Sequence, residues 1–397
     1  MKRKIIGVSL LTLATGVYAQ SSVTIYGIVD SGLTYQTAQP GGKYFATQSG
    51  GSNESRWGLQ GTEDLGGGTK ANFQLESGIN AMNGTVGNSG ALSSGLFERH
   101  ATVGLSNEAY GAFKLGNLGA GFIAQDSWDF DPQQMWAYSI GTLDRSRVWA
   151  QAGNGIEYTS PSFGGLTVKG QYALTNSAGN WNGCSGSSCG SQPSNDGNPQ
   201  GRADGVKLMY NNRNIELVGI YDEIRDQNGQ FSSVYAASRE TMLGGTYTWG
   251  PLKAYIGYQW LRAPQATLAN QSVTTGTVTG SLPAGITGAP TTVNHEWAGL
   301  SYTASPFVTV TGAIYHANAN NGNGNATMYT LAGAYNLSKR TFLYTELAYV
   351  TNSATSNIGV GNGSYYGPNT AQGGANTNAP DYGKSQFGAI AGIMHQF

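Results

Sequence analysis

Residues 63–80 read EDLGGGTKANFQLESGIN, and this stretch decides the fold. From Thr69 onward, apolar and polar side chains alternate, with Ala71, Phe73, Leu75 and Ile79 on one face and Lys70, Asn72, Gln74 and Glu76 on the other. Alternation of this kind over about ten residues is typical of a β-strand with one apolar face. The residues at 63–68 tolerate positive φ and predict a tight turn into the strand.

Fifteen further segments show the same alternation, which brings the expected number of strands to sixteen. They cover residues 22–36, 55–65, 97–105, 112–116, 155–160, 166–174, 205–211, 214–223, 239–249, 252–262, 294–304, 307–317, 327–337, 341–350 and 384–397. Short turns and longer connections alternate along the chain. Antiparallel strands with short turns at one end and long loops at the other are typical of an outer-membrane barrel.

A soluble β-sandwich or a secreted lectin is the alternative, but sixteen strands in two open sheets would leave long edges to protect. A closed barrel removes the edges and satisfies every backbone group in lipid. Aromatic residues near the strand ends fit interfacial girdles; they are Tyr26, Trp57, Tyr210, Tyr221, Trp249, Tyr258, Trp260, Trp297, Tyr335 and Tyr349. We therefore predict an all-β fold, a 16-stranded antiparallel transmembrane β-barrel.

Residues 117–154 are a long interruption of this pattern and alternate nowhere. A gap of this length is usually functional or disordered. Disorder is disfavoured by the apolar side chains, which are Phe122, Trp128, Phe130, Met135, Trp136, Tyr138 and Trp149. We expect the segment to fold into the barrel, to lay its aromatic rings on the wall and to offer Asp126, Asp129 and Asp131 to water. It would then be the constriction of a pore.

The first nineteen residues have the pattern of an export signal, with Lys2, Arg3 and Lys4 before an apolar run and a small-x-small cleavage site at 17–19. A membrane anchor is the alternative, but the apolar run at 5–17 is too short to span a bilayer as a helix. We expect a signal peptide at 1–19 and one barrel domain at 20–397. The mature chain would carry 18 Lys and Arg against 22 Asp and Glu, a formal charge of −4 that suggests no nucleic-acid partner.

The sequence gives little support for an enzyme. Its four histidines, His100, His295, His316 and His395, are scattered, and no HExxH, GxSxG or Cys/His metal motif occurs. We expect no cofactor and no metal. Cys184 and Cys189 are the only cysteines, and in an oxidising compartment they favour a small local disulfide over a metal site, since two thiolates alone do not close a zinc site.

Five motifs carry a resemblance to a known family. SSVTIYGIVD at 21–30, RWGLQGTEDLGGGTKANFQLE at 56–76, RHATVGL at 99–105, NGIEYTSPSFGG at 154–165 and the terminal Phe397 resemble the general diffusion porins of Gram-negative bacteria, β-proteobacterial type. The resemblance covers the whole mature chain. Ser162 is a departure, because the family often has an acidic residue after this proline.

The resemblance implies a homotrimer in the outer membrane, in contact with its lipid and lipopolysaccharide, and a third extracellular loop folded inward. It also implies that Phe397 ends the signal that the barrel-assembly machinery recognises. The function implied is passive diffusion of ions and small hydrophilic solutes through a water-filled channel.

Selectivity in such a channel depends on the charges at its narrowest section. In the family, basic wall residues face acidic loop residues, which here suggests Arg56, Lys70 and Arg99 opposite Asp126, Asp129 and Asp131. Arg145 and Arg147 end the loop and are expected to join the basic cluster. Arg99 shares a strand face with apolar Val103 and Leu105, so it needs a bulge or a position above the membrane band. Basic residues dominate this set, and a weak anion preference follows.

Two other functions stay open. A substrate-specific channel would need a saturable site, such as a ladder of Trp128, Trp136 and Trp149. An outer-membrane adhesin would use its long loops, of which the Gly/Asn-rich segment 351–383 is one, to bind a partner.

Overall fold

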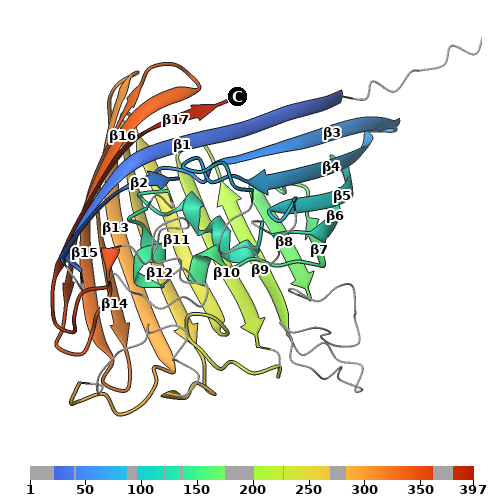
Figure 1. Cartoon of the computed structure of the whole chain (residues 1–397). Coiled ribbons are helices and arrows are strands. Elements are labelled where there is room, and N and C mark those ends of the chain that lie inside the picture. Colours follow the sequence, from blue (N-terminus) through green and yellow to red (C-terminus); the bar gives the residue numbers. More distant parts are fainter. Residues whose placement is uncertain are drawn as a thin grey trace, which may run out of the picture.

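The computed structural model describes residues 22–39, 42–86, 96–119, 121–134, 137–145, 147–174, 201–226, 228–268, 283–360 and 379–397. Its strands form a single antiparallel sheet that closes on itself, because β1 (Ser22–Gln39) pairs with the last strand, β17 (Gln386–Gln396). Figure 1 shows the resulting barrel. The closed 16-stranded antiparallel barrel expected from the sequence is confirmed.

The remaining strands follow one another around the barrel in chain order. They are β2 (Gly42–Ser49), β3 (Arg56–Gly66), β4 (Thr69–Gly78), β5 (His100–Asn107), β6 (Gly111–Asn117), β7 (Gly155–Thr159), β8 (Leu166–Ala173), β9 (Arg202–Asn211), β10 (Ile215–Arg225), β11 (Arg239–Trp249), β12 (Leu252–Arg262), β13 (Thr292–Ser305), β14 (Val308–Ala319), β15 (Gly324–Asn336) and β16 (Thr341–Asn352). Short turns join strand pairs such as β3–β4 and β11–β12 at one end of the barrel. Such turns mark the periplasmic end.

One segment differs from the prediction. β2 lies where a polar connection was expected, and it pairs with the second half of β1, whereas β3 pairs with the first half. The two segments therefore share one strand position in the barrel wall, so the seventeen strand segments form a barrel of sixteen strands. The sequence of β2, GKYFATQS, alternates too briefly to be distinguished from a loop.

Side chains alternate between lipid and lumen along each strand, as the sequence predicts. On β11, Leu243, Tyr247 and Trp249 are exposed on the outer face, while Glu240 and Met242 are buried inside. Two of the expected girdle aromatics are on the wrong face, because Tyr26 hydrogen-bonds to Glu76 inside the barrel and Trp297 packs on the loop segment Phe130. Their strand parity, rather than their position near a strand end, decides this.

The protein's apolar core lies inside the barrel, between the wall and the loop that joins β6 to β7. This loop carries three short helical turns, η1 (Ile123–Asp129), α1 (Ile140–Leu143) and η2 (Arg147–Trp149), which lie within the ring of strands (Figure 1). None of the helices in the described ranges has the length and apolar character to cross a bilayer. The inward fold of the loop agrees with the expectation from its aromatic content.

Glycines in the wall make room for the loop. The ring of Phe130 occupies the space that a Cβ at Gly244 would need, and Tyr138 does the same at Gly388. A larger residue at either position would push the loop off the wall. These glycines therefore allow loop and strand to pack closely, and the loop becomes a fixed part of the lumen.

Candidate functional site

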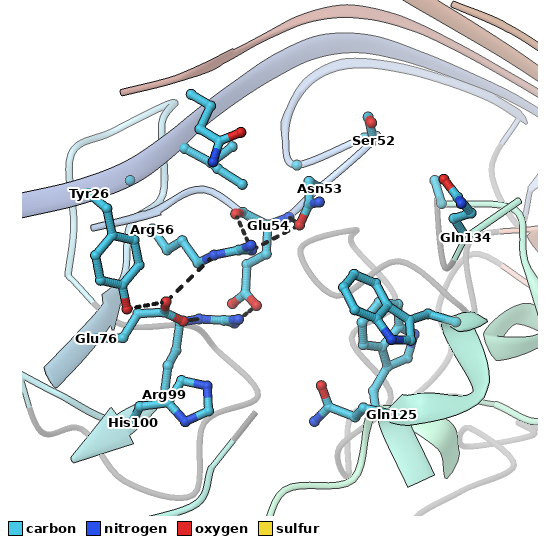
Figure 2. A pocket seen from close by; sticks show the side chains of 18 of the residues that line it. Tyr26, Ser52, Asn53, Glu54, Arg56, Glu76, Arg99, His100, Gln125 and Gln134 are labelled. Carbon is cyan, nitrogen blue, oxygen red and sulfur yellow. Dashed lines mark hydrogen bonds and ion pairs between the residues drawn. The ribbon is translucent and has the colours of Figure 1, made fainter. Parts of the chain in front are cut away.

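A cavity of about 450 Å³ separates the loop from the part of the wall that β1, β3 and β4 form. Figure 2 shows the two sides of this space, with Arg56, Glu76 and Arg99 on the wall and Gln125 on the loop. Asp126, Trp128 and Trp149 also line the loop side. The lining of this cavity is mainly polar or charged.

The wall side is a connected group of charges around Glu76, the wall cluster. Arg99 Nε donates to Glu76 Oε1 at 2.6 Å, and its guanidinium also pairs with Glu54. Arg56 Nε lies 3.7 Å from the other Glu76 oxygen, to which the Tyr26 hydroxyl donates at 2.8 Å. The dashed contacts in Figure 2 follow this group. Each arginine is therefore held by a carboxylate of the wall itself.

Arg99 lies one residue before β5 begins at His100. Because it stands outside the strand, the alternation that would turn it toward lipid with Val103 and Leu105 does not apply to it. Its side chain is buried beside Glu54 and Glu76. This position removes the difficulty that strand parity raised for the residue.

The loop acids Asp126 and Asp129 have partners that the sequence did not suggest. Lys169 Nζ on β8 lies 2.6 Å from Asp126 Oδ2, and Lys207 Nζ on β9 lies 3.2 Å from Asp126 and 2.7 Å from Asp129. Asp126 lines the same cavity as Arg56 and Arg99, which agrees with its expected place opposite these arginines. Their pairing with lysines ties η1 to the wall.

Asp131 is a structural residue of the loop and is not offered to water. It is fully buried, and its carboxylate accepts hydrogen bonds from the Tyr315 hydroxyl at 2.6 Å and from the backbone N–H groups of Gln133 at 3.0 Å and Ile140 at 3.1 Å. Burial raises the pKa of Asp131 to about 6, against the opposing effect of these donors. The prediction that placed it at the pore surface is wrong.

Arg145 and Arg147 lie near the end of the loop, and neither lines the cavity. Arg147 is completely buried and pairs with Asp222, while its Nε donates to Ser238 Oγ at 2.9 Å. Arg145 donates to Asn357 Oδ1 at 3.1 Å and stands over the Tyr235 ring. Their assignment to the basic cluster is corrected, because Arg147 ties the end of the loop to β10, and Arg145 contacts the segments that follow β10 and β16.

Asp144 belongs to the same buried group as Arg147. Its carboxylate accepts from the backbone N–H groups of Arg147 and Val148 at 3.0 Å each and from Gln259 Nε2 at 3.1 Å. Burial raises the pKa of Asp144 to about 7. The end of the loop is therefore fixed by polar contacts that water does not reach.

Lys70 lies far from the constriction. It is exposed on β4 opposite Asp64, next to the turn at 66–68, whereas the wall cluster is at the other end of that strand. The strand prediction gave its face correctly, but it could not tell how deep in the channel the residue lies. Lys70 belongs to the periplasmic mouth.

The loop aromatics divide into two sets. Phe122, Phe130 and Tyr138 are buried against the wall, as expected, and Phe130 stacks on Trp297 with ring centroids 5.7 Å apart. Trp128 is 54% exposed and faces the cavity, which contradicts the expectation that all of these rings cover the wall.

Three residues of interest, Trp136, Cys184 and Cys189, fall outside the described residues. Within the part of the chain that the structure describes, no group of three or more His, Cys, Asp or Glu residues is arranged to hold a metal ion.

The residues that the sequence reasoning missed at the site are Glu54, Lys169 and Lys207. Strand alternation contains a signal for both lysines, because each stands on the inward face, opposite exposed residues such as Leu166 and Leu208. Glu54 precedes β3 and has no such signal. Which inward charges reach the loop depends on the strand register, and that is a property of the folded barrel.

Comparisons with known proteins agree with this architecture. Residues 7–355 match the profile of the family described as Gram-negative porin. The chain is 28% identical over 411 residues to outer membrane porin protein 32 of Delftia acidovorans, covering 100% of both chains. It is 28% identical over 389 residues to an outer membrane porin protein of Bordetella pertussis, covering 89% of this chain and 95% of that one.

Among solved structures, the anion-selective porin from Comamonas acidovorans superimposes with a TM-score of 0.69 at 24% sequence identity, over 95% of this chain and 100% of that one. The shared fold includes the closed barrel. Porins of this kind are channels of the outer membrane. The chain therefore belongs to the Gram-negative porin family, and it is an outer-membrane general diffusion porin.

Proposed function

We propose that the channel passes ions and small hydrophilic solutes passively and prefers anions weakly. The observation that carries this proposal is the exposure of the paired charges in the lumen. The basic partner is the more exposed one in three pairs: 22% against 5% for Arg56 and Glu76, 38% against 9% for Lys114 and Glu157, and 21% against 17% for Lys169 and Asp126.

This asymmetry matters because a permeating ion meets the exposed partner first, while the buried partner acts from behind it. Low-dielectric walls focus the field of such charges into the water-filled section. Lys207 is the exception, since its side chain is 10% exposed against 20% for Asp129. Because each of these basic side chains has an acidic partner, the net field is small, and the expected preference for anions is weak. The similarity to a porin described as anion-selective points the same way.

We also propose the assembly state that the family implies, a homotrimer in the outer membrane. One related fold is described as a trimer form, that of an outer membrane protein from Vibrio cholerae. The chain would lose residues 1–19 on export, close a disulfide between Cys184 and Cys189, and be inserted by the barrel-assembly machinery through its last strand. Phe397 directly follows that strand, and its backbone exchanges hydrogen bonds of 3.0 Å and 3.2 Å with Gly27 on β1.

The test is planar-bilayer recording of the purified protein in a KCl gradient. The proposal predicts stepwise conductance, in groups of three for a trimer, and a reversal potential of the sign for chloride. Arg56→Glu should move the preference toward cations. If folded, heat-modifiable protein gives no conductance steps, the channel function is wrong and adhesion through the long loops becomes the leading alternative.

A substrate-specific channel is the second candidate, and the exposed ring of Trp128 in the cavity beside Trp149 is the observation that favours it. Solute flux that saturates with concentration would support a binding site at these rings. Flux that rises linearly would support general diffusion.

A further inference from the structure

Four arginines gather on the outer face of the barrel, where β9, β10, β11 and β12 end at the side of the long loops. They are Arg202, Arg225, Arg239 and Arg262, and we call them the arginine row. Each has the strand parity of exposed apolar residues lower on its own strand, namely Leu208, Leu217, Leu243 and Ile256. The arginine row therefore faces out of the barrel and takes no part in the pore.

The strand register places the row at two adjacent levels of the barrel rim. In the register of the sheet, Asp204 on β9 lies opposite Glu223 on β10. Glu223 lies opposite Arg239 on β11, and Arg239 lies opposite Arg262 on β12. Arg202 and Arg225 face each other one step further out. The row thus follows the rim of the barrel over four adjacent strands.

The row has more positive than negative charge. Asp204 and Glu223 are the carboxylates of these strands on that face, and Arg202, Arg225 and Arg239 contact them at 2.6 to 3.8 Å. Arg262 stands over the ring of Trp260. Residues 263–291, which join β12 to β13, contain no Asp or Glu.

Arg239 and Arg262 are direct cross-strand neighbours. Like charges in that position destabilise a sheet unless something else neutralises them. Arg239 is held in place, because its guanidinium and that of Arg225 each stack on the Phe231 ring at 4.3 Å. Its side chain is nevertheless 43% exposed. Arg239 and Arg262 are therefore exposed cationic side chains at neighbouring positions, and of the two it is Arg239 that also contacts Glu223.

The depth of this pair can be estimated from β11. Arg239 and Trp249 are the two ends of this 11-residue strand, so they are about 33 Å apart along it at about 3.3 Å per residue. With a tilt of about 45°, this corresponds to a height of about 23 Å, close to the roughly 25 Å of the apolar band of such barrels. With Trp249 at the periplasmic boundary, the arginine row lies at the outer boundary, at the level of the lipid headgroups.

We propose that the arginine row binds the phosphate groups of an outer-leaflet lipid whose acyl chains lie on the apolar face below. Guanidinium groups match phosphate in geometry and charge, and they donate paired hydrogen bonds to it. The exposed side chains of Leu243 and Ile256 provide the acyl surface on the same two strands. This inference rests on the outer-membrane location, and it assigns a site and a chemistry to the lipid contact.

The experiment measures binding of bisphosphorylated lipid A to the purified protein in detergent by native mass spectrometry. Arg239→Gln/Arg262→Gln should weaken binding about thirtyfold, since each arginine near a charged lipid surface contributes about 1 kcal/mol. The matched control is Lys339→Gln/Arg340→Gln, which removes a basic pair at the turn between β15 and β16 and should bind as the wild type does. Equal binding by all three proteins overturns the proposal.

Two further arms identify the source of the phosphate. Inorganic phosphate at the same concentration should neither compete with the lipid nor raise the melting temperature, and dephosphorylated lipid A should bind as weakly as the double variant does. If either arm behaves as bisphosphorylated lipid A does, the proposal is wrong. The double variant should keep wild-type conductance, because the row faces away from the pore, so loss of the fold is detected separately.

Thermal melting with and without lipid A provides an independent test of the proposal. Without lipid A, Arg262→Gln should melt at the wild-type temperature or above it, because it relieves the repulsion between like charges. With lipid A, the variant should melt below the wild type. A variant that melts lower in both conditions would show that Arg262 stabilises the barrel without a lipid, and the proposal would then be rejected.

Discussion

Arg56 and Arg147 lie on the two sides of the inward loop and show how different these sides are. Arg56 is part of the wall cluster, is 22% exposed and borders the open cavity. Arg147 is completely buried with Asp222 behind the loop. We call the side of the loop that borders the cavity the wet side and the buried side the dry side. An arginine on the wet side can influence the passage of ions, whereas an arginine on the dry side holds the loop to the wall. The fold, and not the residue type, decides which role a charge has.

The largest effect is expected on the dry side. Arg147→Met leaves Asp222 and Glu240 buried without a cation, and breaking a buried pair in this way costs about 3–5 kcal/mol. The loop should detach, with noisy conductance and a lower temperature for the heat-induced shift in gel mobility. Arg56→Met is the matched control and should melt within a few degrees of the wild type. Equal melting of the two variants would remove the distinction between the two sides.

Two aromatic residues provide a second contrast. Phe130→Ala should destabilise loop docking by about 3–5 kcal/mol, because it removes a buried ring and leaves a cavity beside Trp297. Trp128→Ala should leave stability unchanged and raise conductance, because its ring stands in the open passage. Melting and single-channel recording of both variants check this. Loss of stability in Trp128→Ala would show that its ring holds the loop.

The dry side should also respond to pH. The docked loop raises the pKa of Asp131 to about 6, against about 3.9 for an exposed aspartate. The docked state therefore binds an extra proton between these values, and the stabilisation present at low pH is lost as the pH rises through 6. Asp144, with a pKa of about 7, acts in the same direction.

When the pH rises from 5 to 7.5, deprotonation of Asp131 alone should lower the equilibrium constant for docking of the loop about tenfold. Hydrogen exchange of the loop amides, corrected for intrinsic rates, measures this change. Asp131→Asn should reduce the pH response by that factor, because asparagine does not titrate. A response of the same size in the variant would mean that Asp131 does not sense the docking of the loop.

The smallest effect concerns selectivity. Arg56→Gln should lower the ratio of anion to cation permeability by a few-fold, since an exposed, screened charge acts with about 1 kcal/mol or less. Lys70→Gln at the periplasmic mouth should change the ratio less. Reversal potentials in a KCl gradient give both values. A larger shift in Lys70→Gln would place the selective section at the mouth.

The period-two pattern made the barrel predictable, because it depends on local alternation that each strand carries in its own sequence. The inward loop was predictable too, since its aromatic content requires a surface to cover. The partners of the charges were not predictable. Asp126 pairs with Lys169 because of the way the loop crosses the lumen, and Asp131 is buried because Tyr315 on the far wall reaches it. Contacts of this kind depend on the register and closure of the whole barrel.

The central claim is that ions pass through the cavity between the loop and the wall cluster. The most direct test is single-channel recording of Trp128→Cys, in a protein with Cys184→Ser and Cys189→Ser, before and after a negatively charged thiol reagent. The account predicts that modification lowers the conductance and moves the preference toward cations, while Trp249→Cys on the outer face shows no change. Unchanged current after complete modification at position 128 would contradict it.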